Sequence, residues 1–212
     1  MTKSTPDQLL ARQHEIVGNP PRIEELPREQ YLDQAMAQWT MLRSNYAGRP
    51  LEPGNPDEVP TIFFTMLRRA NTWEKLSDLT MALTGQAEID IRSREIIILR
   101  VGWILGAPYE FGEHVTKSRE AACLTDEEIK RVTLGSDAPG WSAYESALIR
   151  AVDELKEDAM ITDMTWAALE EHCTPEVLIE IPMVVGFFTM IAYFQNALRL
   201  PLRGVNQGLQ AI

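Results

Sequence analysis

The chain has 212 residues, of which 45% are hydrophobic and 24% are charged, a balance typical of a soluble globular protein. This length is enough for one domain with a well-formed core. Acidic residues outnumber basic ones 31 to 20, and the net charge of −11 repels phosphate backbones and anionic lipid. We therefore expect no nucleic acid and no membrane surface as a partner.

The sequence shows no pattern of export or membrane insertion. Its opening stretch lacks the apolar segment of a secretory signal. The longest apolar-rich run, residues 181–194, contains Pro182 and is shorter than the roughly 20 residues that a membrane-spanning helix needs. Cys123 and Cys173 form no CxxC motif, which fits a reducing compartment and excludes a cysteine-based zinc module. We expect a cytoplasmic protein.

Residues 1–60 are predicted to form an irregular N-terminal arm with one helix. Residues 1–30 are polar and rich in proline, which is typical of irregular structure. From Tyr31 to Tyr46, apolar residues recur at steps of three and four, which predicts an amphipathic helix. Residues 48–60 are rich in proline and glycine, so we expect a long loop there.

Residues 61–212 show a helical pattern almost throughout, so the predicted fold is all-α within a single domain. Ser93 is expected to cap a helix over residues 94–105, which Gly106 ends. Pro108 then fits the first turn of a helix that reaches about Ala121.

Further helix starts are visible in the second half of the chain. Thr125 with Glu128 and Ser142 with Glu145 form capping boxes, in which a hydroxyl and a carboxylate satisfy free backbone donors. A final long helix is expected to begin at Thr174. Because that helix is apolar nearly all round, it must be buried in the core or in a subunit interface, and we expect a symmetric homo-oligomer.

The residues best suited to chemistry lie between positions 93 and 114. Glu110 and His114 are four residues apart and therefore share one helix face. A carboxylate beside an imidazole raises its pKa and fixes its tautomer, which makes a general acid/base pair. Glu95 approaches that face if its helix folds back at Gly106. The same spacing is also common on solvated helix faces, so a purely structural role stays open from spacing alone.

The segment RSREIIILRVGWILGAPYEFGEHVTKSREAACLTDEEI, residues 92–129, resembles the signature of the carboxymuconolactone decarboxylase family, which includes the alkyl-hydroperoxidase-D-like (AhpD-like) proteins. Similarity in further segments extends over about residues 60–200. The resemblance implies an AhpD-like helical bundle that assembles as a homo-oligomer, with a trimer or hexamer expected and a dimer as the alternative. It also implies an active site in the helix pair that carries Glu95 and His114.

The peroxidase branch of that family carries a Cys-x-x-Cys-x-x-x-His motif, with a glutamate twelve residues before the first cysteine. His114 matches the histidine and Glu95 matches the glutamate, but Ala107 and Glu110 stand at the cysteine positions. Without those thiols the disulfide-cycling mechanism has no nucleophile. The resemblance to members without the thiols implies a cofactor-free, decarboxylase-like lyase or isomerase that acts on a small carboxylated or lactone catabolite.

In this hypothesis His114 delivers or removes a proton at carbon, while Glu110 orients the imidazole and Glu95 is a second acid/base or holds the ring in register. The residues expected to bind the substrate are Tyr109, Phe111, Trp103 and Arg94. Two alternatives stay open: a metal-dependent enzyme with Glu95, Glu110 and His114 as ligands, and a non-catalytic oligomeric binding protein. The leading hypothesis needs no metal and no other cofactor.

Overall fold

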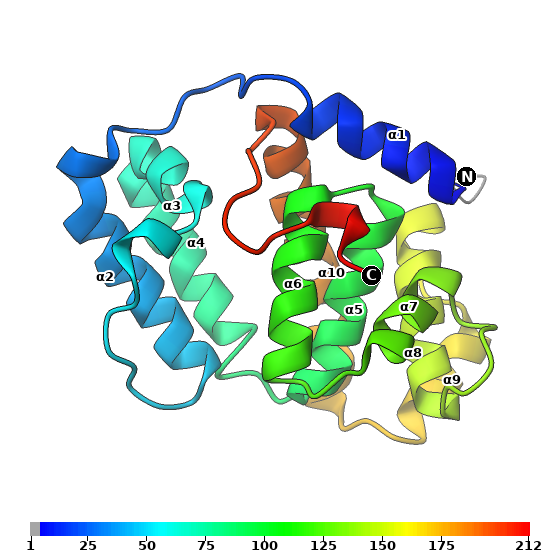
Figure 1. Ribbon diagram of the computed structural model, residues 1–212. Coiled ribbons are helices and arrows are strands. Elements are labelled where there is room, and N and C mark those ends of the chain that lie inside the picture. Colours follow the sequence, from blue (N-terminus) through cyan, green and yellow to red (C-terminus); the bar gives the residue numbers. More distant parts are fainter. Residues whose placement is uncertain (1–4) are drawn as a thin grey trace.

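The computed structural model describes residues 5–212, which form helices joined by turns and loops, without a strand (Figure 1). The predicted all-α fold is confirmed. The α-helices are α1 (Pro6–Val17), α2 (Arg28–Tyr46), α3 (Thr61–Met66), α4 (Ala70–Ala82), α5 (Ile91–Ile104), α6 (Pro108–Glu120), α7 (Asp126–Leu134), α8 (Ala143–Asp158), α9 (Asp163–Glu170) and α10 (Pro175–Leu198). Short 3-10 turns are η1 (Pro56–Glu58), η2 (Leu67–Arg69) and η3 (Gly208–Gln210).

Helix α5 is the centre of the fold, and every residue from Ser93 to Gly102 is buried. It packs against α6, α7, α8 and α10. The β-branched run of residues 96–98 is helical although isoleucine is only a moderate helix former, because apolar neighbours enclose it and burial outweighs propensity. Asp90 caps α5 by accepting the Ser93 N–H at 2.9 Å, so the expected cap at Ser93 lay three residues too late.

The turn after α5 folds α6 back along it, as predicted. Gly106 has a φ of +54°, a left-handed conformation that glycine adopts without steric cost, and Pro108 begins α6. Gly102 allows the two helices to approach closely, because a Cβ at this position would lie 3.2 Å from the backbone nitrogen of Phe111. Side chains on the facing sides of α5 and α6 are therefore close enough to form hydrogen bonds.

Three apolar clusters of described residues hold the helices together. The first joins α5 to α8, α9 and α10, and the second joins α5 and α6 to α1, α7 and η3. The third lies within α2, α3 and α4. Figure 1 shows this α2–α4 unit beside the central helices α5 and α6, with α1 running across one end of the molecule. The α2–α4 unit therefore has an apolar core of its own.

The prediction of an irregular arm over residues 1–30 is wrong for residues 6–17, which form α1. Thr5 and Gln8 make a capping box with each other, and Pro6 occupies the first position of the helix. Leu9 packs into the second cluster and so ties α1 to the central helices. Residues 1–60 therefore contribute two α-helices instead of one. Residues 1–4, part of the same prediction, lie outside the described residues.

The capping signals of the second half of the chain are confirmed. Thr125 and Ser142 cap α7 and α8 in complete capping boxes, and Thr174 caps α10. Among the described residues, α10 alone is long and apolar enough to cross a membrane by those two criteria. Its inner face, however, packs Phe187 and Phe188 into the first cluster, so on that side α10 is a core helix.

Candidate active site

The structure brings Glu95, Glu110 and His114 together, with Glu95 on α5 and the other two residues on α6. Glu95 is 0% exposed, and Glu110 and His114 are each 3% exposed. The Nδ1 atom of His114 lies 2.7 Å from Glu95 Oε2, and its Nε2 atom lies 3.3 Å from Glu110 Oε1. The imidazole is therefore held between two carboxylates, one at each ring nitrogen.

Glu95 accepts hydrogen bonds at both carboxylate oxygens. The Tyr46 hydroxyl donates to Oε1 at 2.7 Å, and Ser118 Oγ donates to Oε2 at 3.3 Å. Burial acts to raise the pKa of Glu95, but the charge and hydrogen bond of His114, with the Tyr46 hydrogen bond, outweigh burial and lower this pKa. Glu95 is therefore ionised at neutral pH and accepts the Nδ1–H of His114.

His114 is polarised from several sides. Burial and the Lys117 ammonium, whose Nζ lies 3.5 Å from Nε2, act to lower the pKa of His114. The two carboxylates outweigh these effects, and the pKa of His114 is raised. The ring of Phe188 meets the imidazole edge-to-face at 5.3 Å between centroids. Because the Nδ1–H donates a hydrogen bond to Glu95, Nε2 is the nitrogen that can exchange a proton with another group.

Glu110 has one satisfied and one unsatisfied oxygen. Gln195 on α10 donates from Nε2 to Glu110 Oε2 at 2.7 Å. Glu110 Oε1 is buried, and its described contact is the 3.3 Å ion-pair contact with His114 Nε2, which falls short of a regular hydrogen bond. A buried polar atom left without a partner is costly, and a catalytic role is one of the explanations for it. The Nε2 side of His114 is therefore the candidate reactive side.

Arg94 is the one residue of the expected substrate-binding set that reaches this cluster. Its guanidinium lies over the Tyr46 ring at 4.9 Å and donates to the Thr84 carbonyl at 2.8 Å, while Nε lies 3.8 Å from Glu95 Oε1. Arg94 is only 3% exposed. The Arg94 guanidinium therefore interacts with Glu95 and Tyr46 and is not available to bind a substrate.

Tyr109, Trp103 and Phe111 have packing roles in other parts of the fold. The Tyr109 hydroxyl accepts the Ile62 N–H at 3.4 Å. Trp103 and Phe111 pack ring against ring at 5.3 Å in the second apolar cluster. Neighbours in a helix point about 100° apart, so residues adjacent to Glu110 in sequence face other elements. The structure does not bring these three rings to the imidazole of the site.

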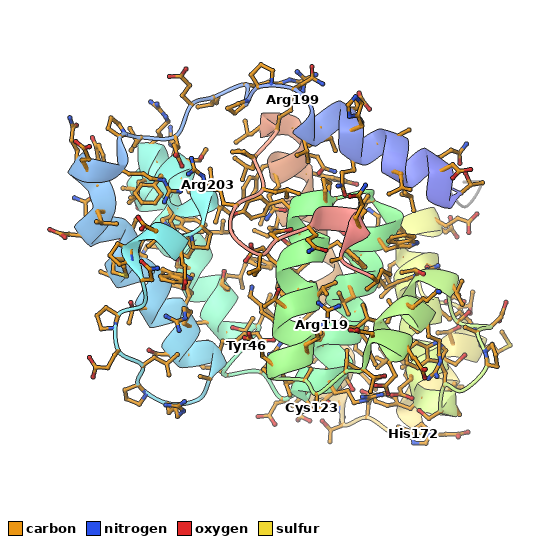
Figure 2. All side chains as sticks on the ribbon, viewed as in Figure 1. Tyr46, Arg119, Cys123, His172, Arg199 and Arg203 are labelled. Carbon is orange, nitrogen blue, oxygen red and sulfur yellow. The ribbon has the colours of Figure 1, made fainter. Side chains whose placement is uncertain are left out.

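Four residues of the site were not found from the sequence: Tyr46, Ser118, Lys117 and Gln195. Lys117 and Ser118 follow His114 by three and four residues on α6, and that helical spacing was an available signal. Tyr46 and Gln195 come from α2 and α10, so only the tertiary fold brings them near. Figure 2 shows Tyr46 between the α2–α4 unit and α6.

The geometry does not suit the metal site considered as an alternative. Glu95 and Glu110 contact opposite nitrogens of His114, so the three groups cannot converge on one ion. The Lys117 ammonium beside Nε2 would also repel a cation. Across residues 5–212, no group of three histidine, cysteine, aspartate or glutamate side chains is arranged to hold a metal ion.

Neither cysteine has a described contact with the site. Cys123 is exposed in the turn that follows α6 (Figure 2). Cys173 interacts with Tyr144 just before α10, and burial raises its pKa. A raised pKa makes the reactive thiolate scarcer at neutral pH. We find no thiol nucleophile beside His114 among the described residues.

The comparison with solved structures establishes the fold. An uncharacterized peroxidase-related protein from Silicibacter has a TM-score of 0.69 and 14% identity, over 91% of this chain and 99% of its own. An uncharacterized peroxidase-related protein from Ralstonia eutropha, described as an alkylhydroperoxidase AhpD core, has a TM-score of 0.69 and 17% identity, over 87% of this chain and 94% of its own. The debrominase Bmp8 has a TM-score of 0.68 and 12% identity, over 88% of this chain and 94% of its own.

No protein-family model matches the sequence, and the comparison with curated proteins gives no match. At identities below a fifth, similarity to the solved structures shows the fold alone. The chain therefore has the AhpD-like fold, which the sequence resemblance predicted. What the protein does has to be argued from the site.

Proposed function

We propose that this protein is a cofactor-free lyase or isomerase in which His114 transfers a proton on a small carboxylated or lactone catabolite. The observation that carries the proposal is the buried imidazole, bound by Glu95 at Nδ1 and flanked by Glu110 at Nε2. Its fixed tautomer and raised pKa suit proton transfer near neutral pH. The fold leaves the reaction open, since its neighbours include a debrominase and peroxidase-related proteins.

The geometry favours the second of the two roles expected for Glu95, holding the imidazole in register, and gives Glu110 a role other than the expected orienting one. Glu95 is the orienting group, because hydrogen bonds occupy both its oxygens and its lowered pKa keeps it ionised. Glu110 lies beside the reactive nitrogen of His114 and keeps one oxygen without a hydrogen bond. It is therefore the carboxylate positioned to relay the second proton.

In a decarboxylation, the bond between the carboxylate carbon and its neighbour breaks, CO2 leaves, and the electron pair passes into the conjugated lactone or alkene. His114 in its protonated form then donates the Nε2 proton to carbon. In an isomerisation, neutral His114 removes a proton from one carbon and returns it to another. Lys117 is the cation best placed to hold the substrate carboxylate, because its Nζ lies 3.5 Å from Nε2.

Lys117 and Tyr46 are half-buried, whereas Glu95 and His114 are enclosed. These two side chains are the most exposed of the site, so the proposal has the substrate reach His114 from their side. The thiol peroxidase reaction is not part of the proposal, because Ala107 stands at the position of the motif's first cysteine.

Proton exchange with solvent tests the proposal. The protein is incubated in D2O with small unsaturated acids and carboxylated lactones, and NMR follows deuterium incorporation and loss of the carboxylate. We expect His114→Gln to reduce the rate at least about 100-fold, the contribution of a general acid/base. His14→Gln is the matched control, because His14 is an exposed histidine on α1 and should leave the rate unchanged.

Two outcomes would contradict the proposal. Saturable binding of a panel compound without exchange or product would favour the non-catalytic binding protein. Activity that is lost after chelation and restored by a divalent metal would favour the metal-dependent alternative, and the cofactor-free mechanism would then be wrong.

A further inference from the structure

The outer face of α10 carries an apolar stripe that the protomer leaves uncovered. Ile179 is 62% exposed, Met183 46%, Met190 43% and Tyr193 57%. Gly186 lies in the middle, and a Cβ at this position would have no atom within 4 Å. These five residues, the α10 stripe, follow one another at steps of four and three. This 3.5-residue average is the spacing with which two helices pack along a seam.

Within the protomer, the contact described for the stripe is at its end, where Lys156 Nζ on α8 donates to the Tyr193 hydroxyl at 3.1 Å and lies over the Tyr193 ring at 5.1 Å. The opposite face of α10 packs Phe188 on His114 and places Gln195 on Glu110. From Ile179 to Tyr193 the stripe spans about 21 Å at the helical rise of about 1.5 Å per residue. A continuous exposed apolar surface of this kind marks an interaction site.

The two ends of the stripe carry opposite charge. Glu176 is exposed in the first turn of α10, and Glu171 is exposed just before the helix. At the other end, next to Tyr193, a pocket of about 290 Å³ lies between α1 and the end of α10. Arg12, Arg22 and Arg199 line this pocket together with Glu15. Glu15 pairs with Arg12 at 2.8 Å, so Arg22 and Arg199 supply the net positive charge of the pocket. Figure 2 shows Arg199 at that end of α10, near α1.

We propose that the α10 stripe is the seam of a two-fold dimer, in which α10 of one copy packs antiparallel on α10 of a second copy and crosses it near Gly186. A two-fold axis uses the same patch on both copies, and the stripe has one glycine near its midpoint with apolar side chains on either side. The glycine allows the helix axes to approach closely. Met183 then faces Met190 of the partner subunit, and Ile179 faces Tyr193 of the partner subunit.

Charge selects the antiparallel direction. In that direction the acidic start of each α10, with Glu176, meets the arginine pocket of the partner, and this happens at both ends of the seam. A parallel pair would set Glu176 against Glu176 of the partner subunit. The antiparallel pair also opposes the two helix dipoles.

Gly186→Leu tests the seam with little risk to the protomer. The space around position 186 is open in the protomer, and leucine is a better helix former than glycine. We expect light scattering after size exclusion to give the wild type an even number of 24.0 kDa protomers, and G186L half that mass. Leu134→Glu is the control: Leu134 is 65% exposed on α7, which packs against α5 and α6, and the variant should keep the wild-type mass.

A charge pair tests the direction. Met183→Glu alone puts a carboxylate into the apolar seam, and we expect it to halve the mass. The double variant M183E/M190K sets the new carboxylate of one copy against the new ammonium of the other when the helices are antiparallel, so the wild-type mass should return. In a parallel seam, like charges would meet and the copies would stay apart.

A wild-type monomer, or an oligomer whose mass neither G186L nor M183E changes, would overturn the proposal. Dissociation by M183E without recovery in M183E/M190K would overturn the antiparallel arrangement. Circular dichroism of each variant should show wild-type helix content, which separates loss of the seam from loss of the fold.

Discussion

Replacing Glu95 by glutamine removes the charge at the centre of the site and keeps the shape of the side chain. Glu95 has two hydrogen bonds of 2.7 Å, one with Tyr46 and one with His114. A hydrogen bond to a charged group contributes about 1.5–3 kcal/mol, against about 1 kcal/mol for a neutral pair. Loss of the charge at both bonds should therefore lower the free energy of unfolding by about 1–4 kcal/mol at pH 6.

The effect of Glu95→Gln should depend on pH. The pKa of His114 is raised from 6.5, so its protonated form stabilises the fold fully below that value, and this contribution is lost as pH rises through the folded pKa. The pKa of Glu95 is lowered from 4.5, so its ionised form stabilises the fold above that value. The pair contributes most between pH 4.5 and 6.5, and the cost of the substitution should shrink in alkaline solution.

Urea denaturation at pH 6 and again in alkaline buffer measures this difference. NMR titration of His114 in the Glu95→Gln variant gives a second measurement. We expect its pKa to fall, because burial and the Lys117 ammonium remain after the carboxylate charge is removed. Glu52→Gln, in an exposed loop, is the control and should change neither quantity. An equal loss of stability at both pH values, or an unchanged pKa of His114, would refute the reasoning.

Three further predictions follow from single contacts. Tyr46→Phe removes a hydrogen bond to the buried, charged carboxylate of Glu95 and should lower the free energy of unfolding by about 1.5–3 kcal/mol in urea titrations, and no change would contradict the contact. Gly112→Ala places a Cβ against the side chain of Asn206, so it should lower stability by about 1–3 kcal/mol and increase hydrogen exchange in the C-terminal segment. Replacing Cys123 and Cys173 by serine should leave hydroperoxide consumption with a dithiol reductant unchanged and low, and robust wild-type turnover that the double variant loses would contradict this.

Local signals in the sequence determined where most helices begin and end. Capping at Thr125 and Ser142 and the proline at Pro108 involve residues within one helical turn of each other, so the chain carries the whole signal in a few positions. The Thr5 and Gln8 pair that starts α1 is equally local. The prediction of an irregular arm rested on the prolines of residues 1–30, but Pro6 occupies the first position of α1, where proline is compatible with a helix.

Local sequence signals also predicted that Glu95, Glu110 and His114 lie together. The spacing of Glu110 and His114 puts them on one face of α6, and the Gly106 turn brings Glu95 to that face. The spacing did not determine which carboxylate contacts which ring nitrogen of His114. The structure pairs Nδ1 with Glu95, which fits the expectation that Glu95 holds the ring in register, and it places Glu110, which was expected to orient the imidazole, beside Nε2.

Only the tertiary structure decided the remaining contacts. Tyr46 hydrogen-bonds to a residue 49 positions away, and Gln195 to one 85 positions away, and no helical period relates such distant residues. Along α10, Phe188 and Met190 are both apolar in sequence, yet the first is buried and the second exposed. Periodicity shows that a helix has faces, but which face is covered depends on how the neighbouring helices pack against it, because burial is a property of the assembled elements.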